Sequence, residues 1–125
     1  MNDDLTSELM AALGEDGFFR LTEAHGGTRL YVPEDPARSE LPSTIGFDNT
    51  FRLSKLFPGG YIRVPLAREF RAIRYRNNGT SNRDIARKLG ITESGVDNLI
   101  RRVRNKEPGK IRAKKDPRQI DMFEV

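Results

Sequence analysis

A series of polar side chains that can bind DNA bases lies along one predicted helix, Thr92–Asn105. Because an α-helix turns by about 100° per residue, Ser94, Asn98, Arg101 and Asn105 share one side of it. Asparagine can form paired hydrogen bonds with adenine, and arginine with guanine or with phosphates. The spacing therefore predicts base recognition in the major groove of duplex DNA. The candidate DNA-contacting residues are Arg83, Thr92, Ser94, Asp97, Asn98, Arg101, Arg102, Arg104 and Asn105.

The opposite side of this helix is apolar, and a preceding helix is expected to cover it. The apolar stripe comprises Val96, Leu99, Ile100 and Val103. Ser81 can cap the preceding helix by accepting a hydrogen bond from the Asp84 amide, and Thr92 can cap the second helix. Gly90 allows the left-handed turn between them. This pattern predicts a helix-turn-helix, and the alternative is an ordinary helical hairpin in some other α-helical domain.

A further helix is predicted directly before this pair, over residues 66–77. Pro65 can serve as its first residue, because a proline lacks only an amide that has no helical partner there. The inward side chains are expected to be Leu66, Phe70 and Ile73, and the outward ones Arg68, Arg71 and Arg74. The three helices together would form one DNA-binding unit.

The positive charge of the chain is concentrated on this segment. The whole chain of 125 residues has a formal net charge of only +4. Residues 1–60 carry 5 basic and 10 acidic side chains, whereas residues 61–115 carry 16 basic and 5 acidic ones. A basic segment is expected where a protein displaces counterions from a phosphate backbone. A solvated basic surface would explain the charge, but not its coincidence with the motif.

The N-terminal half contains a weak internal repeat. Residues 18–33 and 51–65 each read as a short helix, a Gly-Gly break, a strand of four or five residues and a proline. The glycine pairs are expected to end the helices, and the prolines to end the strands. These residues are Gly26-Gly27 with Pro33, and Gly59-Gly60 with Pro65.

Two short strands are marginal alone and need a partner. They can pair with each other, or each with its copy in a second subunit. We predict a homodimer built on residues 1–60, because DNA readers of this kind often bind two half-sites as two-fold dimers. The alternative is a monomer with an intramolecular ribbon. A helix near Asp4–Leu13 presents Leu5, Leu9 and Leu13 on one face, and it would join the dimer core or form a loosely attached arm.

The expected fold is mostly α with a small β element. Residues 1–60 form an N-terminal dimerisation region with the short strands, and residues 61–105 form the three-helix helix-turn-helix domain. Residues 106–125 are expected to be a flexible basic linker followed by a peptide motif.

Residue usage argues against an enzyme and predicts no cofactor. The chain has no cysteine and a single histidine, His25, so a metal site lacks ligands. His25 precedes a predicted helix end, where an imidazolium suits the negative end of the helix dipole. No apolar run approaches membrane-spanning length, and the N-terminus is acidic where a secretion signal is basic. A cytoplasmic, nucleoid-associated bacterial protein is expected.

The order of these elements resembles the Mor/C family, the middle- and late-operon transcription activators of Mu-type phages and prophages. The resemblance covers about residues 59–104 and rests on the strand, the proline, the arginine-bearing helix, the Asn78-Gly79 turn and the helix-turn-helix ending in RRVR. It implies a dimer that reads an inverted repeat and contacts RNA polymerase. It also implies that Ser94, Asn98, Arg101 and Arg102 lie on the recognition helix.

The C-terminal tail carries a second motif. Its residues resemble the bacterial sliding-clamp-binding pentapeptide, and they are Gln119, Ile120, Asp121, Met122 and Phe123. Met122 and Phe123 would fill an apolar pocket of the clamp, and Gln119 would form hydrogen bonds at a second pocket. Alternatively, the tail folds back on the protein's own core or touches RNA polymerase.

Three functions are therefore open. The leading one is a sequence-specific transcriptional regulator, an activator that binds duplex DNA as a dimer. The second is a DNA-bound accessory of replication, repair or a mobile element that docks on the sliding clamp. The third is a helical protein-interaction module with an incidental basic face.

Overall fold

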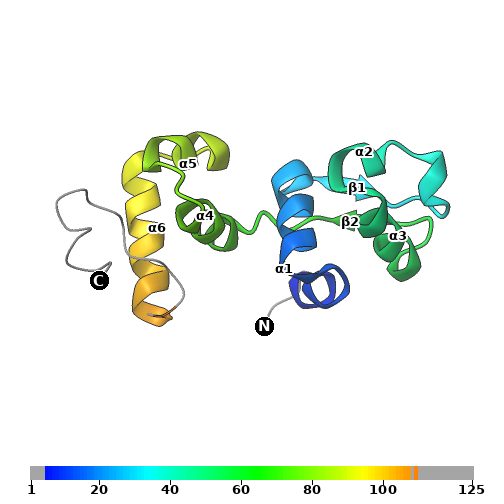
Figure 1. The fold of residues 1–125 in the computed structure, drawn as a ribbon, viewed down its shortest axis with the longest axis horizontal. Helices are drawn as coiled ribbons and strands as arrows, with labels where there is room; N and C mark the ends of the chain where they lie inside the picture. Colours follow the sequence, from blue (N-terminus) through cyan, green and yellow to red (C-terminus); the bar gives the residue numbers. More distant parts are fainter. Residues whose placement is uncertain (1–4, 108, 110–125) are drawn as a thin grey trace, which may run out of the picture. The chain divides into compact units, whose positions relative to one another are not determined.

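A computed structural model of the chain describes residues 5–107 and residue 109. Among these residues the fold is mostly helical with one small sheet, as predicted (Figure 1). The elements in chain order are α1 (Thr6–His25), β1 (Arg29–Tyr31), the 3-10 helix η1 (Pro36–Arg38), α2 (Leu41–Ile45), α3 (Phe47–Leu56), β2 (Tyr61–Arg63), α4 (Arg68–Asn77), α5 (Asn82–Leu89) and α6 (Glu93–Lys106). The described residues divide into two compact units, with the boundary between Arg71 and Ala72. None of the helices in the described ranges is long and apolar enough to cross a membrane.

Helix α1 joins two stretches that the sequence suggests as separate helices. Gly14 interrupts it with φ 75° and ψ 173°, a backbone conformation that side-chain-bearing residues rarely adopt. Figure 1 shows the two halves of α1, in different shades of blue, running in different directions. The first half buries Leu9 and Leu13, as predicted, and the second half buries Phe18 and Leu21. Both halves can therefore face the same core.

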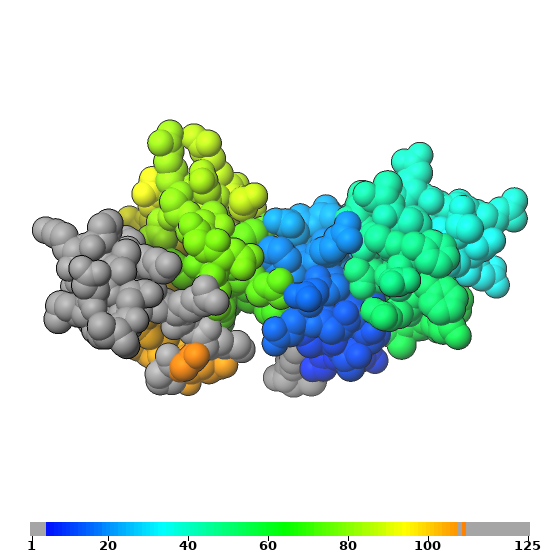
Figure 2. All heavy atoms as spheres, viewed as in Figure 1, coloured from blue at the N-terminus to red at the C-terminus, as the bar shows by residue number. Residues whose placement is uncertain are grey.

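The core of the first unit is formed where α1, α2, α3 and the two strands meet. Figure 2 shows the blue spheres of α1 in direct contact with the green spheres of α3. The buried side chains of this cluster are Leu9, Leu13, Phe18, Leu21, Val32, Leu41, Ile45, Leu53, Ile62 and Val64. Thr22, also fully buried, donates its hydroxyl hydrogen bond to the Phe18 carbonyl at 3.0 Å. The fold thus satisfies this buried polar group within its own helix.

The two strands pair antiparallel with each other within one chain. Leu30 lies opposite Ile62 on the inner face, and Tyr31 lies opposite Tyr61 on the outer face. The ladder continues to Val32, whose amide donates to the Gly60 carbonyl at 2.7 Å, and ends just before Pro33. The pairing that the strands need is therefore made inside the chain, which was the alternative arrangement. The homodimer stays a prediction.

The start of α4 differs from the prediction. The helix begins at Arg68 rather than at Pro65, because Ala67 has φ 53° and takes the chain out of the helical path. Leu66 is consequently exposed rather than inward. Arg71, predicted to point outward, is buried, with Nη1 3.5 Å from the Leu66 carbonyl oxygen. Phe70 does face inward, with its ring centroid 5.1 Å from that of Phe18.

Candidate nucleic-acid interface

The local signals that predicted α5, α6 and the turn between them are confirmed. The Asp84 amide donates to the Ser81 hydroxyl at 3.2 Å, and the Gly95 amide donates to the Thr92 hydroxyl at 2.9 Å. Gly90 has left-handed angles, φ 71° and ψ 35°. The two capping hydroxyls thus mark where α5 and α6 begin, and the glycine marks where α5 ends.

The predicted apolar stripe of α6 is buried, and its residues are Val96, Leu99, Ile100 and Val103. On α5 the buried residues are Ile85, Ala86 and Leu89. In the part of α4 that belongs to this unit, Ala72, Ile73 and Tyr75 are buried. The Lys88 ammonium lies 5.5 Å from the centroid of the Tyr75 ring, a cation–π contact between α5 and α4. Among the described residues, the polar side of α6 is exposed.

The predicted DNA-contacting residues lie at the surface. The exposed ones are Arg83, Thr92, Ser94, Asp97, Asn98, Arg101, Arg102, Arg104 and Asn105. Ser94, Asn98, Arg101 and Asn105 form one stripe along the outer side of α6. Within that stripe the Arg101 guanidinium donates from Nη1 to the Asn98 side-chain oxygen at 3.1 Å. The Asn98 amide nitrogen therefore points elsewhere and remains a donor for another group.

Asp97 has a partner within the chain. The Asn82 side-chain amide donates to the Asp97 carboxylate at 2.6 Å, and Arg76 donates from Nη2 to the Asn82 side-chain oxygen at 2.7 Å. This chain of hydrogen bonds links the end of α4, the first residue of α5 and the second turn of α6. Asp97 thus contributes to holding the three helices together.

A depression of about 250 Å³ lies beside this hydrogen-bonded chain. Its lining is Arg76, Asp97, Ile100, Arg101 and Arg104. Three arginines and a single aspartate therefore line one hollow. Neither Arg76 nor Asn82 was predicted as a site residue. The sequence signal that could have found them is the short turn at Asn78-Gly79, which brings the end of α4 close to the start of α5.

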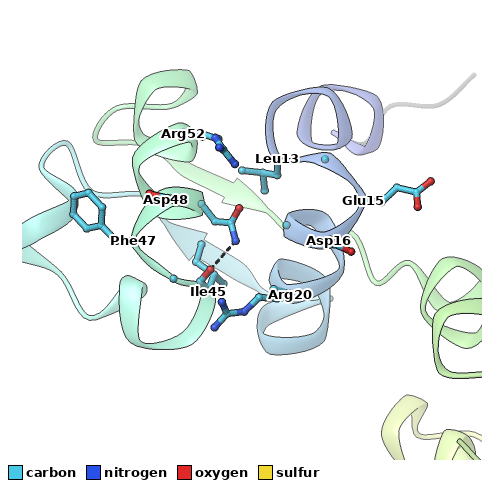
Figure 3. A pocket seen from close by; sticks show the side chains of 12 residues that line it. Leu13, Glu15, Asp16, Arg20, Ile45, Phe47, Asp48 and Arg52 are labelled. Atoms are coloured by element: carbon cyan, nitrogen blue, oxygen red, sulfur yellow. Dashed lines mark hydrogen bonds between the residues drawn. The ribbon is translucent and has the colours of Figure 1, made fainter. Parts of the chain in front are cut away.

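A second hollow, of about 750 Å³, lies in the first unit between the bend of α1 and the start of α3 (Figure 3). Its charges are mixed, with Arg20 and Arg52 beside Glu15, Asp16 and Asp48. Arg20 donates to the Thr44 carbonyl at 3.2 Å, and Asn49 donates from Nδ2 to the Ile45 carbonyl at 2.7 Å. These polar groups stabilise the end of α2 and present no uniform charge to a ligand.

His25 has a different environment from the one predicted. Its Nε2 lies 2.9 Å from the Thr44 hydroxyl, which itself donates to the Leu41 carbonyl. The hydroxyl therefore accepts from His25, and the ring carries a proton on Nε2. Partial burial lowers the pKa of His25. Burial thus favours the neutral ring over the imidazolium that the sequence predicts at the helix end.

Within the described part of the chain, no group of three or more His, Cys, Asp or Glu residues could hold a metal ion. The predicted basic linker and the peptide Gln119–Phe123 lie outside the described residues, apart from the first two linker residues and Gly109. No protein-family model, no curated protein and no solved structure matches this chain. The inference of function therefore depends on the chain's own residues.

Proposed function

We propose that the protein is a sequence-specific regulator of transcription that binds duplex DNA through a helix-turn-helix formed by α5 and α6. The observation that carries this proposal is the stripe of exposed Ser94, Asn98, Arg101 and Asn105 along α6, on the side opposite its buried apolar residues. Such a helix can enter the major groove with its polar side toward the bases.

The arrangement of charge supports the same proposal. The segment of residues 61–115, which contains α4 to α6, has 16 basic and 5 acidic side chains. Phosphate contacts from such a surface would supply affinity, and the α6 stripe would supply discrimination between sequences. In keeping with the resemblance to the Mor/C family, we propose an activator in the bacterial cytoplasm that binds an inverted repeat as a homodimer and contacts RNA polymerase.

The decisive experiment is selection of binding sequences from a random duplex pool with the full chain, followed by footprinting on genomic fragments. A regulator of this kind selects one sequence with two-fold symmetry and protects it in competition with nonspecific DNA. Equal retention of every duplex would refute the proposal.

Single substitutions then distinguish residues that discriminate between base sequences from residues that only raise the affinity for all DNA. Asn98→Ala and Arg101→Ala are each expected to cost about 1–3 kcal/mol of discrimination at one base position. Arg38→Ala is the matched control, because it removes one exposed arginine in the other unit. If Arg101→Ala and Arg38→Ala weaken all duplexes by the same small factor, α6 does not read bases.

The peptide QIDMF at residues 119–123 favours a second candidate function, a DNA-bound accessory that docks on the bacterial sliding clamp. A Phe123→Ala variant of the full chain tests it in a pull-down with purified clamp. Docking requires that the variant loses clamp binding while its affinity for DNA stays the same. A pull-down that the substitution leaves unchanged rejects the docking function and leaves the regulator proposal intact.

A further inference from the structure

We propose that the depression lined by Arg76, Arg101 and Arg104 holds one backbone phosphate of the bound duplex. Helix α4 would then contact DNA together with the two helices that follow it. This inference rests on the proposed function and adds to it a residue, Arg76, that lies outside the helix-turn-helix.

The charge of the depression is the first argument. Three arginines and one aspartate line it, so the formal charge of its lining residues is positive. The carboxylate, on Asp97, already accepts the amide of Asn82 at 2.6 Å. Gathering three like charges around one hollow is unfavourable, and an anion placed among them relieves the repulsion. A phosphate diester is the anion that DNA presents along its whole length.

The size of the depression is the second argument. Its volume of about 250 Å³ is far above the roughly 10–15 Å³ that one water molecule requires. The depression is therefore large enough for a phosphodiester group and the water molecules next to it. A base does not enter the depression, because it stays stacked in the duplex. Ile100 supplies the only apolar side chain of the lining.

The position of the depression on α6 is the third argument. Asp97, Arg101 and Arg104 follow one another at intervals of four and three residues, so they lie on one flank of the helix. Arg101 belongs both to this flank and to the outer stripe. When a helix lies in the major groove with its outer side toward the bases, its flanks face the sugar-phosphate backbones.

The orientation of Arg76 is the fourth argument. Arg76 is half-buried, and one of its five N–H donors is bound to the Asn82 side-chain oxygen at 2.7 Å. The guanidinium is therefore held in place before DNA arrives, which reduces the entropy lost on binding. Its remaining donors can approach a phosphate oxygen in the hollow.

The test uses the full chain and measures its affinity for the selected duplex and for an unrelated duplex over a range of salt concentrations. Arg76→Gln removes the charge while retaining an N–H donor, and Arg76→Lys retains the charge. Arg38→Gln makes the same chemical change on an exposed arginine of the other unit. Circular dichroism of each variant verifies that it is folded.

Arg76→Gln is expected to lower the slope of log affinity against log salt by about 1, as the loss of one phosphate contact requires. The ratio of wild-type to variant affinity then falls about 4-fold between roughly 50 and 200 mM salt. The loss is the same on both duplexes, Arg76→Lys keeps the wild-type slope, and Arg38→Gln changes little.

Two results would overturn the inference while leaving the regulator proposal standing. One is an Arg76→Gln slope equal to that of the wild type. The other is a loss confined to the selected duplex, which would make Arg76 a base-reading residue. If the wild-type chain binds no duplex at all, the proposed function itself fails, and the phosphate site fails with it.

Discussion

The side-chain amide of Asn82 donates a hydrogen bond of 2.6 Å to the carboxylate of Asp97, and this bond joins the first residue of α5 to the second turn of α6. A turn of three residues connects the two helices along the chain. The hydrogen bond connects them at a second place, outside the turn. Arg76 extends the connection to α4 through the Asn82 side-chain oxygen. Asp97 therefore acts on the geometry of α6 even if it never touches DNA.

Replacing Asn82 by alanine tests this role. Asn82→Ala is expected to lower the free energy of unfolding by about 1 kcal/mol, the usual net contribution of one hydrogen bond. Asp97→Ala should cost a similar amount alone and little more in the Asn82→Ala background, because both changes remove the same bond. Urea denaturation of the two single variants and the double variant measures the coupling. Strictly additive losses would contradict the role assigned to the bond.

The close approach of α1 and α3 gives a second prediction. A Cβ atom at Gly17 would lie 2.5 Å from the Asn49 side-chain oxygen and 2.8 Å from the Leu13 Cβ. Gly17→Ala should therefore destabilise the protein by about 1–3 kcal/mol, as overpacking does. Thermal unfolding measures the loss. Gly17→Ala combined with Asn49→Ala should cost less than the sum of the two single changes, and an additive result would show that the crowding has another source.

The turn between α5 and α6 gives a third prediction, one that depends on backbone conformation alone. A Cβ atom at Gly90 would meet nothing within 4 Å, yet the residue has φ 71°. Gly90→Ala should cost about 1 kcal/mol, whereas Gly90→Asn should cost less, because asparagine tolerates the left-handed region better. Denaturant titration ranks the three proteins. Equal stability of the alanine and asparagine variants would argue against the left-handed requirement.

The pH dependence of stability gives a fourth prediction. Burial lowers the pKa of His25 in the folded chain below its ordinary value of 6.5. As the pH falls through that value, the unfolded chain takes up a proton that the folded chain does not, so stability decreases. Above it both states are neutral and His25 makes no pH-dependent contribution. His25→Gln should remove this part of the acid destabilisation, measured as the difference in unfolding free energy between about pH 7.5 and pH 5.5. A difference of the same size in both proteins would exclude His25 as its source.

The helices of the second unit could be predicted largely from sequence, because the residues that begin and end them act on their near neighbours in the chain. A capping hydroxyl at Ser81, another at Thr92 and a glycine at position 90 each act over at most three or four residues. The polar chain from Arg76 through Asn82 to Asp97 could not be predicted, since its members are brought together by the packing of three helices. The sequence therefore predicts Asp97 only as a residue that contacts DNA.

In the first unit, packing against the core decides the conformation of segments whose own residues do not predict it. Leu41–Ile45 contains a proline and two hydroxyl residues, yet it forms α2 because Leu41 and Ile45 are buried in the core. The acidic residues Glu15 and Asp16, directly after Gly14, form the first turn of the second half of α1, where the positive end of the helix dipole suits them. Arg71 is buried although its position in the sequence pattern predicts an outward side chain, and its Nη1 lies 3.5 Å from the Leu66 carbonyl oxygen.

The tyrosines of the protein can report on its two units separately, through their fluorescence. The chain contains three tyrosines and no tryptophan, so tyrosine dominates its ultraviolet emission. Tyr31 and Tyr61, on the outer side of the ribbon, are 48% and 61% exposed, whereas Tyr75 in α4 is 3% exposed. Iodide in solution should quench the first two and leave the third bright until the helical unit opens. The melting of that unit can thus be followed in the unlabelled chain.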